Sequence, residues 1–447
     1  MKTWFIALSL LLSTTCWASL ASYHNHNEAN SYTDPYRNIT RKGDNLEAVI
    51  LKELKGAKKS IYIAVQELRL PLIAQLLVEK HRQGVDVRIV LEHDYNFNVL
   101  QQQQVNHDET ADSNVSSLAQ LVDVNKNNRF EKSELESRDA IYMLQEARVP
   151  LIDDTSDGSR GSGLMHHKFV IIDGITTIVS TANFTMSCIH GDLDDSATRG
   201  NANSMVVAKS KGLADIFNQE FSQLWGNGQY GNFGKNKTYR GPQTVTVEGS
   251  KITVQFSPTS ERFNWAHTVN GLIGSHLVKA SHSIKAALFV FSDQKLANSM
   301  LKAQERGAEI GVLIDPGFAM RYYSELLDLL GLQLIDEVKC VYEPDNNPWK
   351  TPITEGGMVI LPKGDMLHHK FAVVDEKKVI IGSQNWSDSA NYSNDETLIV
   401  VENKSISESY SQEYKRLKKS SLLGPSKKLL RQIQHNESVC AEQGHDF

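Results

Sequence analysis

The sequence predicts an α/β protein of two similar α/β/α domains, with a functional site at the interface between them. Of its 447 residues, 40% are hydrophobic and 22% are charged, which is the composition of a folded globular protein. At about 100–200 residues per domain, this length allows two or three domains. An internal repeat reduces the number to two, because each copy of the repeat alternates strands with helices.

A strand, a helix, a closing glycine and a second strand occur twice in the same order. In the first half, apolar strands are predicted over 60–65 and 85–91, and Gly84 ends the helix between them. In the second half, the first strand is predicted over 283–288, and Gly307 ends the helix. The two copies are 223 positions apart at both the strand and the glycine. This constant spacing indicates two copies of one fold.

The boundaries of the domains follow from changes in composition. We expect the first domain over residues 38–228 and the second over 242–422, joined by a segment rich in glycine and asparagine. Residues 423–447 are expected to form a C-terminal tail. Because both halves of the site belong to one chain, we expect a monomer.

The N-terminus has the pattern of a secretory signal peptide, which we assign to residues 1–21. A basic residue, Lys2, precedes a short apolar run, and small residues follow near a plausible cleavage point. The run is too short for a membrane anchor, which needs about 20 apolar residues. We therefore expect a secreted or periplasmic protein. Such a compartment permits one disulfide among Cys188, Cys340 and Cys440, or buried free thiols, and the pairing stays open.

The charge balance excludes binding of polyanions through overall charge. The chain has 47 Lys and Arg against 53 Asp and Glu, a formal net charge of −6. Any phosphate chemistry must therefore use a local site. A basic stretch near the C-terminus fits anionic lipid, a nucleic-acid backbone or a plain solvated helix face; it contains Lys415, Arg416, Lys418, Lys419, Lys427, Lys428 and Arg431.

One motif, H-x-K-x4-D followed by an asparagine, occurs once in each half. Alternation along a strand places its histidine and lysine on one face, and the asparagine follows the next strand, so the three converge at a sheet edge. The aspartates lie at the far end of the strand and are interpreted as structural. The residues are His166, Lys168, Asp173 and Asn183 in the first half, and His368, Lys370, Asp375 and Asn385 in the second.

These paired motifs resemble the phospholipase D superfamily over about residues 40–420. The resemblance implies two phospholipase D-like domains and a two-step reaction through a phosphohistidine, without a metal for catalysis. It also implies His166 as nucleophile and His368 as general acid. The lysines and asparagines can hold the non-bridging phosphate oxygens.

A carboxylate that orients a histidine is common in this family. Aligning Glu220 with Glu413 places Glu396 opposite Asn203, so we expect Glu396 to orient His368. Asn203 carries no charge, which leaves Asp192, Asp194 or Asp195 as candidates to support His166. Alternation turns His167 and His369 away from the site, as packed or exposed residues.

The first half carries an insert at about residues 105–137 that resembles an EF-hand calcium loop. Oxygen ligands occur at the positions expected for Ca²⁺, and Asn128 replaces the usual glycine at the sharp turn. We expect a structural calcium ion, against the alternative of an asparagine-rich turn. The predicted ligands are Asp123, Asn125, Asn127, the carbonyl of Arg129, Glu131 and Glu134.

The sequence leaves the substrate open. We favour a phospholipase D that cleaves phospholipid headgroups at a membrane surface, with a nuclease acting on DNA or RNA as the alternative. A non-catalytic binding protein is disfavoured because neither motif has lost its histidine or lysine. Nearby aromatic residues fit a lipid pocket or base stacking equally well; they are Phe184, Trp386, Tyr322 and Tyr323.

Overall fold

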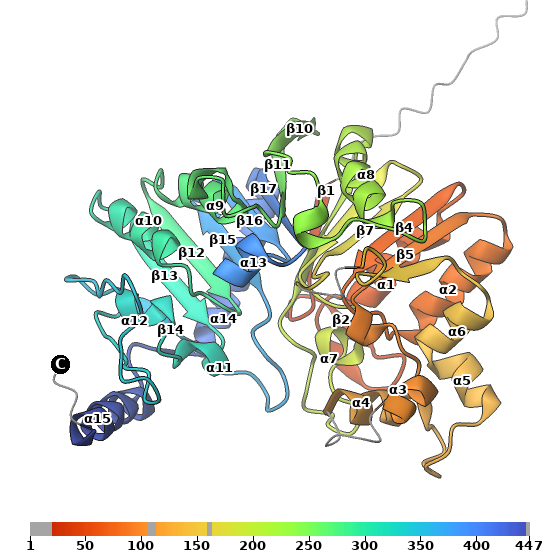
Figure 1. The fold of residues 1–447 in the computed structure, drawn as a ribbon, viewed down its shortest axis with the longest axis horizontal. Helices are drawn as coiled ribbons and strands as arrows, with labels where there is room; N and C mark the ends of the chain where they lie inside the picture. Colours follow the sequence, from red (N-terminus) through yellow and green to blue (C-terminus); the bar gives the residue numbers. More distant parts are fainter. Residues whose placement is uncertain (1–19, 106–112, 159–162, 444–447) are drawn as a thin grey trace, which may run out of the picture.

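A computed structural model describes residues 20–105, 113–158, 163–443 of the chain, and it contains two α/β domains side by side (Figure 1). The expected signal peptide lies mostly outside these residues. Its last two positions, Leu20 and Ala21, belong to the first strand, so the first sheet begins before the expected boundary at residue 38. This strand is short and only partly apolar, which hides it from a search for buried runs. Among the described residues, no helix is long and apolar enough to cross a bilayer.

Within the described residues, the first sheet has seven strands in the order β1-β9-β8-β7-β4-β5-β6. The parallel pair β4–β5 is the predicted repeat, and β4 covers the predicted residues. The strands are β1 Leu20–His24, β4 Ser60–Val65, β5 Asp86–Leu91, β6 Leu151–Asp153, β7 Lys168–Ile172, β8 Thr176–Ser180 and β9 Ser204–Lys209. A small ribbon, β2 Ser31–Thr33 and β3 Thr40–Lys42, stands apart from this sheet.

In the part of the chain that the structure describes, the second sheet has nine strands in the order β10-β11-β17-β16-β15-β12-β13-β14-β18. Its central strands follow the same order as those of the first sheet, so the two domains are similar, as the sequence predicts. The strands are β10 Gln243–Val247, β11 Ser250–Ser257, β12 Ser283–Leu288, β13 Glu309–Ile314, β14 Glu355–Val359, β15 Lys370–Val374, β16 Lys378–Gly382, β17 Glu396–Glu402 and β18 Ser421–Leu423.

Helices cover both faces of each sheet, which gives the predicted α/β/α layers. Gly84 and Gly307 both have positive φ, as expected for residues that close α2 and α10. The helices are α1 Leu46–Lys55, α2 Pro71–Arg82, α3 Val99–Val105, α4 Ser113–Val122, α5 Lys132–Arg138, α6 Ala140–Glu146, α7 Met186–Ile189, α8 Lys211–Trp225, α9 Val269–Leu277, α10 Gln294–Gln304, α11 Pro316–Ala319, α12 Glu325–Leu329, α13 Asp388–Tyr392, α14 Lys404–Lys419 and α15 Lys427–Glu442.

One hydrophobic core joins the two domains. It includes apolar side chains of α8 and α14 together with inward residues of both sheets, such as Phe217, Tyr410, Phe169 and Phe371. Two further cores lie on the outer faces, under α1 and α2 in the first domain and under α9 and α10 in the second. A shared core of fully buried aromatic residues holds the sheets in a fixed relation, which a site at the interface requires.

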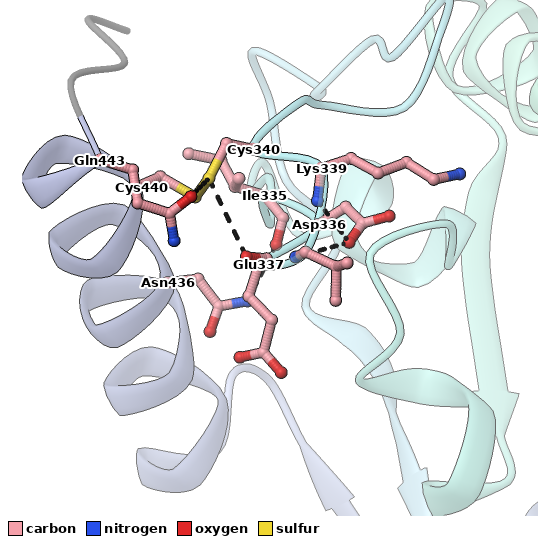
Figure 2. Close-up of a disulfide and its surroundings, with 9 residues drawn as sticks. Ile335, Asp336, Glu337, Lys339, Cys340, Asn436, Cys440 and Gln443 are labelled. Atoms are coloured by element: carbon pink, nitrogen blue, oxygen red, sulfur yellow. Dashed lines mark hydrogen bonds between the residues drawn. A yellow bond between two sulfur atoms is a disulfide. The ribbon is translucent and has the colours of Figure 1, made fainter.

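The C-terminal segment is more ordered than the tail that the sequence suggests. After β18, helix α15 packs against the second domain, and Cys440 forms a disulfide with Cys340 in the loop before β14 (Figure 2). Asn436 on the same helix donates a hydrogen bond to the carbonyl of Ile335 at 2.8 Å. Cys188 remains a buried free thiol. The two alternatives that the sequence leaves open, a disulfide and a buried free thiol, therefore both occur: the first at Cys340 and Cys440, the second at Cys188.

Candidate active site

Both domains help to build the segment that carries each motif histidine. The extended residues before β7 and β15 carry His166 and His368. The backbone N–H of His166 donates to the carbonyl of Asp395 at 3.0 Å, and the N–H of His368 donates to the carbonyl of Ala202 at 3.1 Å. These bonds belong to two isolated parallel bridges that cross between the domains. The site therefore lies at the domain interface, as the sequence predicts.

The expectation that Glu396 orients His368 is wrong, because the support crosses the interface. Glu396 Oε2 accepts a hydrogen bond from Nδ1 of His166 at 2.7 Å. Asn203 Oδ1 accepts one from Nδ1 of His368 at 3.0 Å. Pairing positions 396 and 203 is correct, but each of them serves the histidine of the other domain. The parallel bridges cause this exchange, since they place the start of β17 beside His166 and the start of β9 beside His368.

Neighbouring hydrogen bonds define the tautomer of each histidine. The amide nitrogen of Asn203 donates to the carbonyls of Cys188 and Asn201, so its Oδ1 must face His368. An acceptor at Nδ1 requires Nδ1 to carry the proton, which leaves Nε2 of His368 available for chemistry. The carboxylate of Glu396 has the same effect on His166. In the described part of the chain, no hydrogen bond joins His166 to the three aspartates of the 192–195 loop that the sequence offers as its support.

The two lysines are fully buried beside the histidines. Lys168 Nζ donates to the carbonyl of His166 at 3.0 Å and to Gln66 Oε1 at 3.3 Å, and Asn183 Nδ2 also donates to Gln66, at 3.2 Å. Lys370 Nζ donates to the carbonyl of His368 at 2.9 Å. The predicted convergence of histidine, lysine and asparagine is therefore present in the first domain.

Gln66 is a further residue of the site, and it lies outside both motifs. The 223-residue spacing of the repeat pairs Gln66 with Phe289, and the ammonium of Lys370 lies 5.0 Å from the centre of that ring. One lysine thus has an amide as its neighbour and the other has an aromatic face. The repeat spacing could have identified both residues, because each directly follows the strand that enters the site.

Without a bound anion, the buried site disfavours the positively charged forms of its histidines and lysines. Burial, followed by the charges of Lys168 and Lys370, keeps the pKa of His166 and of His368 well below the usual value. Burial also lowers the pKa of Lys168 to about 8 and that of Lys370 to about 7. Burial raises the pKa of Glu396 to about 7, although Lys168 limits the rise. A phosphodiester anion between the lysines would favour their charged forms.

Two further carboxylates hold the catalytic segments from behind. Glu92 accepts a hydrogen bond from the backbone N–H of Met165 at 2.6 Å, and Asp315 accepts one from the N–H of Leu367 at 2.9 Å. These acids are also 223 positions apart, which makes them equivalent in the repeat. Each one fixes the residue before the first histidine of a motif and so limits the movement of that histidine.

Most of this chain matches a known protein family. A family model described as "Cardiolipin synthase, PLD-like domain" matches residues 50–225 and 273–418, which include both motifs and most of the chain. The chain belongs to this family. As a phospholipase D-like protein, it has the two-domain α/β fold that the sequence predicts.

The individual relatives have low sequence identity to this chain. Mitochondrial cardiolipin hydrolase of Xenopus tropicalis is 27% identical over 143 residues, which cover 32% of this chain and only 57% of that protein. Phospholipase D of Rickettsia conorii is 26% identical over 171 residues, 38% of this chain and 71% of that protein. Phosphatidylserine synthase of Haemophilus influenzae aligns over 95% of this chain and 94% of its own, with a TM-score of 0.56 and 10% identity. That last likeness concerns the fold alone.

The aspartates of the two motifs hold turns, as the sequence predicts. The carboxylate of Asp173 accepts backbone hydrogen bonds from Lys58, Lys59 and Ser60 at 2.7 to 3.1 Å. Asp375 receives equivalent bonds from residues 281–283. Both aspartates have φ of +53°. They therefore tie the end of one strand to the start of its neighbour, away from the histidines.

The second histidine of each motif is packed and points away from the site. His167 Nε2 lies 3.1 Å from Glu220, and His369 Nε2 lies 2.8 Å from Glu413. His167, Glu220 and Asp395 together have the donor set of a metal site. Lys237 forms ion pairs with both acids, at 2.6 Å in the case of Asp395. Its ammonium already supplies the positive charge that a metal would bring.

The EF-hand-like segment forms a helix, a loop and a second helix. The loop connects α4 to α5, and Asn128 at the position of the usual glycine has φ of +59°. The side-chain oxygens of Asp123, Asn125 and Asn127 all turn inward to accept hydrogen bonds from backbone N–H groups of the loop. Glu134 accepts from the N–H of residues 124 and 125. The loop therefore has the turn and the oxygen donors that Ca²⁺ requires.

Proposed function

We propose that this protein is a secreted phosphodiesterase of the phospholipase D type, which hydrolyses the headgroup ester of phospholipids through a phosphohistidine on His166. The observation that carries the proposal is the unequal support of the two histidines. His166 has a carboxylate at Nδ1, whereas His368 has a neutral amide there. The two groups are thus suited to different tasks.

The first step uses His166 as nucleophile. Its Nε2 attacks phosphorus, an N–P bond forms, and the bond from phosphorus to the headgroup oxygen breaks. The phosphorylated ring is cationic because Nδ1 keeps its proton, and the nearby carboxylate of Glu396 stabilises that charge. The amide of Asn203 could not do so for His368. His368 binds a second proton when the substrate anion occupies the site, and as an imidazolium it gives its Nε2 proton to the departing alkoxide.

The second step returns the enzyme to its starting state. His368 takes a proton from water, the resulting hydroxide attacks phosphorus, and the N–P bond to His166 breaks. Lys168 and Lys370 hold the non-bridging oxygens throughout, and Asn183 and Asn385 offer amide donors nearby. Because these groups are buried and fixed, they stabilise the transition state without reorganisation.

We also propose that the protein is exported and that it acts as a monomer. An apolar N-terminal run with small residues after it supports export, and a disulfide between Cys340 and Cys440 suits an oxidising compartment. Both histidines and both supporting residues come from one chain, which supports a monomer as the active form.

We also propose that the loop at residues 123–134 binds Ca²⁺ as a structural ion. Its ligands would be the side chains of Asp123, Asn125, Asn127, Glu131 and Glu134 with the carbonyl of Arg129. The ion would hold α4 and α5 together. It takes no part in the reaction, because the catalytic groups named above account for each proton and each bond.

A substrate panel tests the proposed activity. The purified protein is incubated in EDTA with vesicles of phosphatidylcholine, phosphatidylglycerol or cardiolipin, and separately with single-stranded DNA. We expect release of the headgroup and no cutting of DNA; DNA cleavage without lipid hydrolysis would replace the proposal with a nuclease.

Trapping the intermediate tests the assigned roles. With a phospholipid labelled at phosphorus, acid quenching should recover labelled protein from His368→Ala, which can attack but turns over slowly. His166→Ala should give none. The mechanism is falsified if both variants keep near wild-type turnover, and the roles are reversed if the labelling pattern is reversed.

A further inference from the structure

Two exposed apolar side chains occupy equivalent positions beside the catalytic histidines. Leu164 is 39% exposed and Met366 is 40% exposed. Each lies two residues before its histidine, and they are 202 positions apart, the same spacing as the two motifs. Large apolar side chains in water are ordinary when they are scattered, but a matched pair at the two edges of a site is not scattered.

The backbone direction places both side chains on the catalytic face. The bridges that pair Met165 with Asp395 and Leu367 with Ala202 keep these segments extended. Met165 and Leu367 are fully buried in the core between the domains. In an extended chain successive side chains alternate, so Leu164 must point the opposite way from Met165, together with the histidine two positions later.

Each catalytic segment therefore presents three side chains in a row on one face. Lys168, His166 and Leu164 form the row in the first domain, and the second domain repeats it with its own lysine, histidine and methionine. Exposure rises along the row from 0% at Lys168 through 7% at His166 to 39% at Leu164. The buried lysine and histidine of each domain are thus followed, toward the surface, by one exposed apolar side chain.

Aromatic side chains extend this apolar surface in the second domain. The ring of Phe289 lies 4.9 Å from that of His368 and 4.7 Å from that of Phe318. Both phenylalanines are half-buried. Their repeat equivalents in the first domain are the more polar Gln66 and Tyr95. The apolar surface near the site is therefore broader on the side of Met366.

We propose that Leu164 and Met366 form an apolar lip that contacts the acyl chains of the substrate while the lysines hold its phosphate. The inference rests on the proposed phospholipase D function and names the part of the substrate that this site selects. An amphiphile with a phosphodiester and aliphatic chains matches an anion site that opens between aliphatic side chains.

The surroundings of the lip favour lipid over nucleic acid. Asp365 directly precedes Met366. The carboxylate of Asp192 packs against Gly364 in the same loop, so closely that a Cβ atom at position 364 would lie 2.4 Å from Asp192 Oδ2. These two carboxylates outnumber Lys363, an exposed cation of the same loop, and so disfavour the long polyanionic backbone of DNA or RNA. Proteins that bind single strands combine stacked aromatic rings with basic grooves. Here Phe289 and Phe318 supply aromatic rings on one side of the site only, and the two side chains of the lip itself are aliphatic.

The test measures how activity depends on acyl-chain length. Dibutyroyl and dioctanoyl phosphatidylcholine share one headgroup and are both monomeric below the critical micelle concentration. The measured quantity is the ratio of kcat/KM for the longer to the shorter substrate. We expect Leu164→Ser and Met366→Ser each to lower this ratio about tenfold, since each removes apolar contact with the longer chains.

Ile175→Ser is the matched control. Ile175 is 40% exposed, like the lip residues, but it lies in the turn between β7 and β8, at the other end of the strand from His166. Its chain-length ratio should equal that of the wild type. A wild-type protein that hydrolyses both lipids, with lip variants that keep the wild-type ratio, would overturn the lip and leave the proposed function intact. A wild-type protein that hydrolyses neither lipid would overturn both.

Discussion

Replacing Glu396 by glutamine isolates the charge that the second domain supplies to His166. The side chain is fully buried, and its carboxylate receives hydrogen bonds from His166 at 2.7 Å, from Ser383 at 2.6 Å and from Asn394 at 3.3 Å. The first two bonds end on the same oxygen, Oε2. The carbonyl oxygen of a glutamine can take its place, so Glu396→Gln keeps the shape and the tautomer while it removes the charge.

The expected magnitude follows from the kind of hydrogen bond that is lost. A bond to a charged group contributes about 1.5–3 kcal/mol, and a neutral bond contributes about 0.5–1.5 kcal/mol. The difference, about 1.5 kcal/mol, acts when the ring of His166 becomes cationic during attack on phosphorus. It corresponds to about a tenfold fall in the rate of phosphoenzyme formation. Because Asn394 would then face an amide nitrogen, the loss could only be larger.

Single-turnover kinetics on a chromogenic phosphodiester give the rate of phosphoenzyme formation directly. Glu376→Gln is the control, since Glu376 lies in the turn after β15 and pairs with Lys285 away from the site. The thermal midpoint of both variants should stay near that of the wild type. A rate of phosphoenzyme formation in Glu396→Gln within twofold of the wild type would refute the claim that this carboxylate stabilises the cationic intermediate.

Three other predictions concern pH, calcium and the disulfide. The kcat/KM profile should be bell-shaped, because Glu396 loses its charge as pH falls below about 7 and Lys370 loses its charge as pH rises above about 7; Glu396→Gln should remove the acid limb alone. EDTA should lower the thermal midpoint and Ca²⁺ restore it, while activity in EDTA at low temperature persists; an unchanged midpoint would contradict the calcium loop. Cys440→Ser opens a cross-link that spans 100 residues and should lower the free energy of unfolding by about 4 kcal/mol, as measured in urea, with no further effect of dithiothreitol on the variant.

Much of the fold could be predicted because the sequence carries it twice. A run of apolar residues alone cannot separate a buried strand from a buried helix. Its recurrence with a closing glycine at a constant spacing can, and β4, β5, β12 and β13 all occur where the repeat predicts them. Strand β1 has no counterpart at the corresponding position of the second half. Its mixture of polar and apolar side chains also shows no clear alternation.

The site residues were predictable to the extent that they belong to a strand pattern. His166, Lys168 and their counterparts follow from alternation, and the structural role of Asp173 follows from its place at the turn. The partner of each histidine does not follow, because a hydrogen bond between domains depends on how two sheets pack. Local spacing pairs Glu396 with His368, whereas the interdomain bridges pair it with His166.

The exchange of supporting residues between domains has a consequence for how such a protein can evolve. In an assembly of two identical halves, the positions of Glu396 and Asn203 would be one position, and both histidines would receive the same partner. Joining two copies in one chain removes that symmetry. A single substitution can then give one histidine a charged partner and the other a neutral one, and a division of labour between nucleophile and acid becomes heritable.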